Sequence, residues 1–302
     1  MIAKDRLGEV YMFGAAILWG LLPIVSKQAY LYIPILFCAA FSACVTALFF
    51  AVLLTVRGEW RELLCKSALK SSLIAGVGIG VLFYGLVFWG QSMVPASTTS
   101  VLLLMEVFFS MLLLRIVGNE RLTRRQVMGA SVMVVGAIIV LSPDSMDAFG
   151  LGELILLLAA AIPPIANYHM QKARTLVGVS SILFLRSVIS CAVLLGVSLS
   201  LEAWPSADSL WSALPWVLVN GVLVLGVSKL LWVEAIRFIP ISKAVAMNSL
   251  APLVTLSVAF WWLNEPATWY QWFGCLPLTL GCWLLVSNRS AVRSHKVNPV
   301  SR

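Results

Sequence analysis

Apolar residues fill ten long runs of the chain, and short polar stretches separate the runs. Each run approaches the roughly 20 residues that a helix needs to cross a bilayer. None of them alternates strictly between apolar and polar positions as membrane β-strands do, so the pattern predicts helices. The predicted spans are residues 10–32, 33–56, 72–93, 97–117, 125–142, 150–171, 179–201, 213–237, 243–263 and 269–287.

The breaks between the spans carry turn-forming and charged residues. The clearest are RGEWRELLCKSALK at 57–70, SPDSMDAFG at 142–150 and EAWPSADS at 202–209. No segment has the mixed composition of a soluble domain or of a long linker. The fold class we predict is therefore an all-α integral membrane protein whose folded unit is the membrane bundle.

Composition excludes a soluble domain with a wetted surface. The chain has 302 residues, of which 61% are hydrophobic and 11% are charged, and its mean hydropathy is +0.96. Average soluble domains carry about 25% charged residues. The chain has a net charge of +8, and its basic residues lie mostly in short loops. In that position they determine the orientation of the spans in the membrane, so the charge does not indicate a nucleic-acid partner.

Basic residues are confined to one side of the predicted bundle. Of the 21 Lys and Arg residues, 18 fall in the termini and loops of one side. The loops of the other side carry acidic residues instead, namely Asp144, Asp147, Glu202, Asp208 and Glu265. Because basic loops stay in the cytoplasm, we expect both termini inside, in an inner (plasma) membrane of the bacterial type.

One sequence frame occurs twice in the chain. Residues 118–136 and 263–281 both contain N-E-x-x-T-x-x-Q-x-x-G-x6-G, at an offset of 145 residues. The same offset aligns Pro95 with Pro240, and residues 7–17 resemble residues 151–161. The pattern predicts a duplicated five-helix unit, with a first repeat at 1–145, a second at 146–290 and a polar cytoplasmic tail at 291–302.

An odd number of helices turns the second repeat over in the membrane, so the two repeats are predicted to be inverted. Inverted repeats can exchange conformations and open a site between them to either side, as in secondary transporters. Within the frame, Thr123 and Thr268 are candidate helix N-caps. The glycines of each copy are seven residues apart on one helix face, where they allow close packing.

Four segments carry a family resemblance. They are LWGLLPIVSK at 18–27, MEVFFSMLLLRIVGNERLTRRQVMGASVMVVG at 105–136, LRSVISCAVLL at 185–195 and LAPLVTLSVAFWWLNEPATWYQWFGCLPLTLG at 250–281. Over roughly residues 7–288 the chain resembles the EamA type of the drug/metabolite transporter superfamily. The resemblance implies ten helices in two inverted repeats and export of small metabolites, often amino acids, by proton coupling or exchange.

Three positions depart from that family's pattern. Val107 follows Glu106 where the family often has Glu-Pro, and Ala251 precedes Pro252 in the second repeat. Pro163-Pro164 stands where the first repeat has Trp19-Gly20. These departures weaken the transfer of a substrate from one family member to another.

Charged groups at mid-membrane are candidate functional residues, because a charge at the bilayer centre costs about 2.5–3.5 kcal/mol on insertion scales. Glu106 lies in the middle of its predicted span, where it either works in transport or is a protonated structural carboxyl. Lys229 lies about 12 Å from Arg237 along a helix. It either faces a central site, where it favours substrates with a carboxylate, or reaches the interface.

The remaining substrate or coupling candidates are less buried or less distinctive. Arg186 lies two turns inside its helix, whereas Lys27 near the outer end of the first span can also reach the interface. His169 is either packed or a proton relay, and Asn248 either binds substrate or joins helices. Trp19, Tyr84 and Trp89 are candidates for lining a central cavity.

Other classes of protein lack their sequence signals here. No H-E-x-x-H or G-x-S-x-G motif supports an enzyme, and no G-x-x-x-x-G-K-[ST] motif supports an ATP-driven pump. The two histidines and six scattered cysteines predict neither a metal site nor a cofactor. A carrier of lipid-linked sugar or nucleotide-sugar cargo remains the alternative to an exporter of amino acids or related amphipathic metabolites. The expected partners are a small-molecule substrate, the bilayer and protons, with the chain as a monomer or homodimer.

Overall fold

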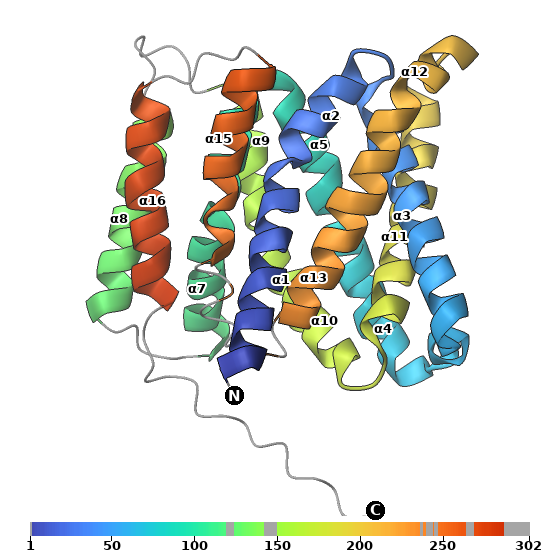
Figure 1. Cartoon of the computed structure of the whole chain (residues 1–302), viewed down its shortest axis with the longest axis horizontal. Helices are drawn as coiled ribbons and strands as arrows, with labels where there is room; N and C mark the ends of the chain where they lie inside the picture. Colours follow the sequence, from blue (N-terminus) through green and yellow to red (C-terminus); the bar gives the residue numbers. More distant parts are fainter. Residues whose placement is uncertain are drawn as a thin grey trace, which may run out of the picture.

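The computed structural model describes residues 2–118, 124–141, 150–235, 238–239, 244, 247–263 and 269–286. Every regular element in these residues is helical, and the helices pack side by side as one bundle (Figure 1). The elements of the first part of the chain are α1 (Ile2–Gly20), α2 (Leu22–Tyr30), α3 (Ile35–Arg57), η1 (Glu59–Leu64), α4 (Lys66–Ala75), η2 (Gly76–Phe83), α5 (Tyr84–Met93), α6 (Ala96–Leu103), α7 (Met105–Gly118) and α8 (Arg124–Leu141). Those that follow are α9 (Leu151–Ala160), α10 (Pro163–Arg174), α11 (Val179–Leu201), α12 (Ala207–Leu218), η3 (Val219–Val227), α13 (Ser228–Ala235), α15 (Ala251–Trp262) and α16 (Trp269–Val286).

Seven helical stretches of the described residues are long and apolar enough to cross a bilayer. They are Arg6–Tyr30, Ile35–Arg57, Lys66–Met93, Ala96–Leu113, Leu151–Arg174, Val179–Leu201 and Ala207–Ala235. Two shorter apolar helices, Ala251–Trp262 and Trp272–Leu284, follow them. The prediction of an all-α multi-pass membrane protein is therefore confirmed, and each predicted span overlaps a helix.

Three predicted spans begin too late. The helices predicted from residues 10, 72 and 213 begin at Ile2, Lys66 and Ala207. At the start of α12 the side chain of Ser206 accepts a hydrogen bond from the backbone N–H of Ser209 at 3.2 Å. A polar cap sets this helix start, and hydropathy cannot register it. The repeated Asn-Glu pairs, with Thr123 and Thr268, lie outside the described residues.

The long helices are interrupted near their middles. Helix α1 gives way to α2 at Leu21, with Pro23 at the second position of α2, and α9 gives way to α10 just before Pro163. Proline cannot donate a backbone hydrogen bond, which favours a break at these points. In α4–η2–α5 and α12–η3–α13 the middle section is instead a π-helix, a form often found at functional sites.

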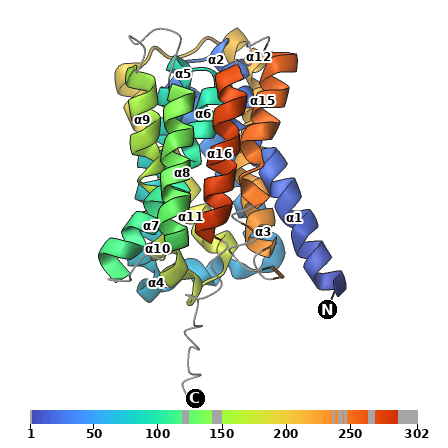
Figure 2. The same ribbon diagram turned by 90° about the vertical axis from the view of Figure 1, so that its left-hand side faces the viewer.

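Glycines bring α8 and α16 into close contact at one end of the bundle (Figures 1 and 2). A Cβ atom on Gly136 would lie 2.9 Å from the carbonyl oxygen of Gly274, and one on Gly281 would lie 2.6 Å from that of Gly129. Residue numbers rise along one helix as they fall along the other, so the helices are antiparallel. The predicted close packing of these glycine faces is confirmed.

The same reciprocity occurs at two other helix contacts. Gly8 approaches Phe238 and Ile239, while Gly152, its partner in the sequence repeat, approaches Met93 and Val94. Those partners are themselves 145 residues apart. Likewise, Gly76 approaches Arg186 and Ile189, and Gly221 approaches Ser42 and Val45. A contact that a glycine of the first copy makes with a helix of the second copy therefore has a counterpart, in which the equivalent glycine of the second copy contacts the equivalent helix of the first.

Helices α3 and α11 form a second antiparallel pair. The N-terminus of each helix is capped by a carboxylate that follows the C-terminus of the other helix in the sequence. Glu202, just after α11, accepts hydrogen bonds from the backbone N–H groups of Leu36 and Phe37 at 2.9 and 3.0 Å. Glu62, after α3, accepts from the N–H of Gly178 at 2.7 Å and from the Ser181 hydroxyl at 2.6 Å. Carboxylates at helix N-termini satisfy free N–H groups and interact favourably with the helix dipole.

Removing either cap should loosen the α3–α11 pair. We expect Glu202→Ala and Glu62→Ala each to lower the free energy of unfolding by about 1–3 kcal/mol, because backbone donors lose a charged acceptor. The measurement is the thermal unfolding midpoint of the purified protein in detergent. Asp208→Ala is the matched control, since Asp208 lies in the exposed first turn of α12. Equal midpoints for Glu202→Ala and Asp208→Ala would contradict this role.

Candidate functional site

Polar and charged side chains meet where the long helices are interrupted. Glu106 lies in the first turn of α7, two residues after the break at Leu104. Its carboxylate oxygen Oε1 accepts a hydrogen bond from the Asn167 side-chain amide of α10 at 3.3 Å. Glu106 and Asn167 are both partly buried. A charge-bearing group is thereby held at the interior of a bundle whose outer surface is apolar.

Lys229 lies opposite, in the first turn of α13 and directly after the π-helical η3. Its ammonium nitrogen is 3.3 Å from the centroid of the Trp19 ring at the end of α1, a cation–π contact. The charge of Lys229 also interacts with those of Glu106 and Arg186. Attraction to the carboxylate and repulsion from the guanidinium therefore act on one ammonium group.

Arg186 joins this cluster from α11, and only 4% of its surface is exposed. Its guanidinium carbon lies 5.6 Å from the centroid of the Tyr84 ring, which belongs to the first turn of α5. Tyr84 interacts electrostatically with both Arg186 and Glu106. We call the set the central cluster, and its members are Trp19, Tyr84, Glu106, Asn167, Arg186 and Lys229.

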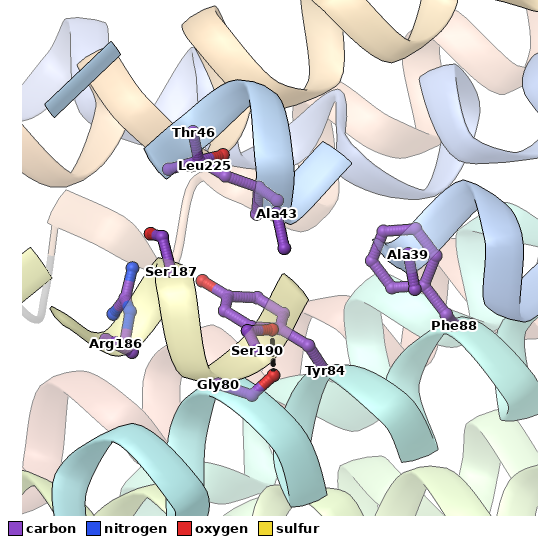
Figure 3. Close-up of a pocket in the computed structure, with 10 residues that line it drawn as sticks. All are labelled: Ala39, Ala43, Thr46, Gly80, Tyr84, Phe88, Arg186, Ser187, Ser190 and Leu225. Atoms are coloured by element: carbon purple, nitrogen blue, oxygen red, sulfur yellow. Dashed lines mark hydrogen bonds between the residues drawn. The ribbon is translucent and has the colours of Figure 1, made fainter. Parts of the chain in front are cut away.

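A small cavity adjoins the central cluster (Figure 3). It offers about 10 Å³ to the centre of a water molecule, which is close to the least that holds one water. The residues that line it come from α3, η2, α5, α11 and η3: Ala39, Ala43, Thr46, Gly80, Tyr84, Phe88, Arg186, Ser187, Ser190 and Leu225. Ser190 donates a hydrogen bond to the Gly80 carbonyl and thereby joins α11 to η2.

The structure brings five of the nine sequence candidates close to one another, namely Trp19, Tyr84, Glu106, Arg186 and Lys229. These five come from helices separated by as many as 210 residues. Four of them lie within two residues of a helix interruption or a π-helix end. The unwound or widened turns provide the space for their polar groups.

The other four candidates lie elsewhere. Trp89 is 46% exposed on the outside of α5, which corrects the expectation that it lines a cavity. Lys27 is partly buried in the last turn of α2. His169 packs edge-on against the Tyr168 ring at 5.6 Å, and its buried Nδ1 has no hydrogen-bond partner. Asn248 is partly buried just before α15.

Sequence reasoning did not nominate Asn167, the amide that holds Glu106. Its signal was present, because it is an uncharged polar residue in an apolar span, close after Pro163-Pro164. A second polar chain was also not predicted. Gln91 donates to the Tyr30 hydroxyl at 2.6 Å, and Tyr30 donates to the carbonyl of Phe88 at 3.0 Å.

Asn220, a further amide in an apolar span, makes contacts between helices. Its side-chain amide donates to the hydroxyl oxygens of Ser26 and Ser42 at 3.2 and 3.3 Å. These bonds join η3 to α2 and α3 in the interior. The Asn220 amide nitrogen is thus engaged between helices, whereas its buried oxygen Oδ1 has no hydrogen-bond partner.

The chain is similar to known transporters in sequence. The EamA-like transporter family matches the chain twice, at residues 6–142 and 150–287. An uncharacterized transporter of Bacillus subtilis (strain 168), YoaV, is 26% identical over 72% of this chain and 76% of its own length. A "probable terminal-alkyne amino-acid exporter" of Streptantibioticus cattleyicolor is 26% identical over 59% of each chain.

Shorter relatives carry a different name. A "probable 4-amino-4-deoxy-L-arabinose-phosphoundecaprenol flippase subunit ArnE" of Pseudomonas fluorescens (strain Pf0-1) is 29% identical over 34% of this chain and 93% of its own. A solved crystal structure has a TM-score of 0.68, covers 94% of this chain and 96% of its own, and is 14% identical, so the likeness shows the fold alone. Since the two family matches together span most of its length, the chain belongs to the EamA-like transporter family and is a multi-pass transmembrane transporter.

Proposed function

We propose that the protein exports small amphipathic metabolites, above all amino acids, across the inner membrane by alternating access. The observation that carries the proposal is the central cluster, in which cationic, anionic and aromatic side chains lie near one another in the interior of the bundle. A zwitterionic amino acid presents an ammonium group, a carboxylate and a side chain, and each has a complementary group there. One relative is named as an amino-acid exporter, which agrees with this cargo.

The alternating movement is proposed to come from two inverted five-helix repeats, at 1–145 and 146–290. Ten crossings with both termini cytoplasmic follow from this arrangement. The antiparallel α8–α16 and α3–α11 pairs and their exchanged glycine contacts support it, because inverted copies produce such pairs by symmetry. The cluster between the repeats would then face each side in turn.

Coupling is proposed to depend on Glu106. Its carboxylate can bind a proton or the ammonium group of a substrate, but not both at full strength. The groups that face it are Asn167 of α10, Lys229 of α13 and Tyr84 of α5. Exchange of proton for substrate between the two access states would make export draw on the proton gradient. The working unit is either a monomer or a homodimer.

A second candidate function has its own support. Relatives named as subunits of a flippase for phosphoundecaprenol-linked aminoarabinose match up to a third of the chain. A carrier of lipid-linked sugar cargo would also use the cationic groups of the cluster. A metabolite panel in proteoliposomes, with and without a pH gradient, separates the two. Export of at least one amino acid supports the first candidate, and movement of lipid-linked cargo alone would replace it with the second.

The proposed topology predicts the side of each loop. Reporter fusions after Ser145 and after Asp208 should report the outside, whereas fusions after Arg125 and after Lys172 should report the cytoplasm. The reason is the one-sided distribution of basic residues. The readout is the activity of paired reporters that work on opposite sides of the membrane. A single fusion on the unexpected side would refute the inverted arrangement.

Glu106→Gln should abolish transport driven by a pH gradient while the protein still folds and inserts. Glutamine keeps the size and an acceptor for Asn167 but can no longer exchange a proton. Uptake of labelled amino acids into proteoliposomes, with and without the gradient, measures the effect. Glu153→Gln is the matched control, because Glu153 also lies in the first turn of a helix, α9, away from the cluster. Wild-type rate and pH dependence in Glu106→Gln would show that Glu106 is only structural.

A further inference from the structure

One buried polar group faces the small cavity without a hydrogen-bond partner, and a buried cation lies beside it. The Tyr84 hydroxyl is buried and makes no hydrogen bond. Among the described residues, the Arg186 guanidinium has no hydrogen-bond acceptor and no carboxylate within ion-pair distance. Figure 3 shows the tyrosine hydroxyl pointing toward Arg186 and Ser187. Buried polar groups in proteins are nearly always paired, so an unpaired hydroxyl beside a buried guanidinium at one cavity indicates a place for a ligand.

The charges of the central cluster point to the sign of that ligand. Arg186 and Lys229 are two cations, and among the described residues Glu106 is the one carboxylate whose charge acts on Lys229. With all three ionised the cluster carries an excess positive charge. An unpaired charge in the membrane interior is costly, and an anionic ligand would remove the excess.

Arg186, not Lys229, is the cation open to such a ligand. The Lys229 ammonium is covered by the Trp19 ring at 3.3 Å and interacts with Glu106. Arg186 has the Tyr84 ring beside its guanidinium, and it lines the cavity. Its planar fork of N–H donors matches a carboxylate in two parallel hydrogen bonds. The sequence had favoured Lys229 for this task, and the cavity favours Arg186.

The sequence repeat strengthens this assignment. Helices α3 and α11 both have 23 residues and begin 144 residues apart, so Arg186 occupies the place that Ser42 has in α3. The Ser42 hydroxyl is engaged by the Asn220 amide. The equivalent position is therefore neutral and satisfied, and the cation belongs to one copy alone. The backbone of both positions lies next to a glycine of the facing helix, Gly76 for Arg186 and Gly221 for Ser42, so the two copies differ here in the side chain.

We infer that Arg186 and the Tyr84 hydroxyl form the anchor for the carboxylate of the transported metabolite. This inference rests on the proposed function and specifies which part of the substrate is bound, and where. The cavity holds about one water, so α3, η2 and α11 must separate for a carboxylate to enter. Ser190 and Gly80 are joined across this contact, which places the anchor at a point where the two sequence copies meet.

The test measures binding of acetate, the smallest carboxylate, to the purified full-length protein in detergent. Acetate should raise the thermal unfolding midpoint of the wild type relative to chloride at equal ionic strength. Arg186→Met should weaken acetate binding about tenfold or more, since charge-assisted hydrogen bonds are lost. Arg186→Lys should restore part of it, and Tyr84→Phe should weaken it less than Arg186→Met does.

A matched control guards against a general effect of removing an arginine. Arg125→Met removes a guanidinium that lies 5.1 Å from the Trp283 ring, at the other end of the bundle. It should bind acetate as the wild type does. Equal acetate shifts in Arg186→Met and the wild type, or no shift in the wild type, would overturn the anchor. A shift with inorganic phosphate but not with acetate would overturn the carboxylate assignment and favour a phosphate-bearing cargo.

Pairs of amino acids and their decarboxylated amines separate this inference from the proposed function. Leucine and phenylalanine should be transported in preference to isoamylamine and phenethylamine, and Arg186→Met should lose that preference. If acetate binds through Arg186 but no amino acid is transported, the anchor stands and amino-acid export fails. If Arg186→Met keeps the wild-type preference for the acids, export stands and the anchor fails.

Discussion

The cost of charge inside a membrane is the constraint on which this structure depends. Glu106, Arg186 and Lys229 belong to helices whose outer faces are apolar, and hydrocarbon would not tolerate them singly. Their charges are stabilised by one another and by neutral side chains. An amide contacts the carboxylate, an indole ring contacts the ammonium group and a phenol ring contacts the guanidinium. Because these partners come from α1, α5, α7, α10, α11 and α13, the charges hold the helices together only when the whole bundle has assembled.

The interrupted helices are the structural answer to this constraint. A continuous α-helix leaves no space at its backbone, whereas the breaks at Leu21 and Leu104 and the π-helical η2 and η3 occur at the level of the charges. The α3–α11 and α8–α16 pairs are built differently, from unbroken helices with small residues, carboxylate caps and close backbone contact. Unbroken helices therefore pack beside interrupted ones, and the cavity lies where the two kinds meet.

Much of this could be predicted from the sequence, for reasons that particular residues make clear. The spans follow from apolar length, and the glycine contacts of α8 and α16 follow from two glycines on one helix face in each copy. Glu106, Lys229 and Arg186 stand out because charge is rare in apolar spans. The carboxylate caps do not stand out, because Glu62 and Glu202 lie in loops and their partners are 116 and 165 residues or more away.

Which way a side chain faces was the least predictable feature. Phe88 is fully buried and lines the cavity, whereas its neighbour Trp89 is 46% exposed. In a soluble helix a polar stripe would have fixed this orientation, but both sides of α5 are apolar, one toward protein and the other outward. The role of Asn167 was not predicted for a related reason. An amide in a membrane span can hydrogen-bond to a neighbouring helix as readily as to a functional group, and the sequence does not distinguish the two.

Symmetry at the periphery and asymmetry at the centre have different physical origins. Glycine contacts depend only on shape, so both copies of the repeat can keep them, and the pairs Gly136–Gly274 and Gly281–Gly129 show that they do. Charge is not conserved between the copies in this way, since the position of Arg186 in α11 corresponds to that of the neutral Ser42 in α3. The duplicated frame therefore has a centre at which its two copies differ in charge.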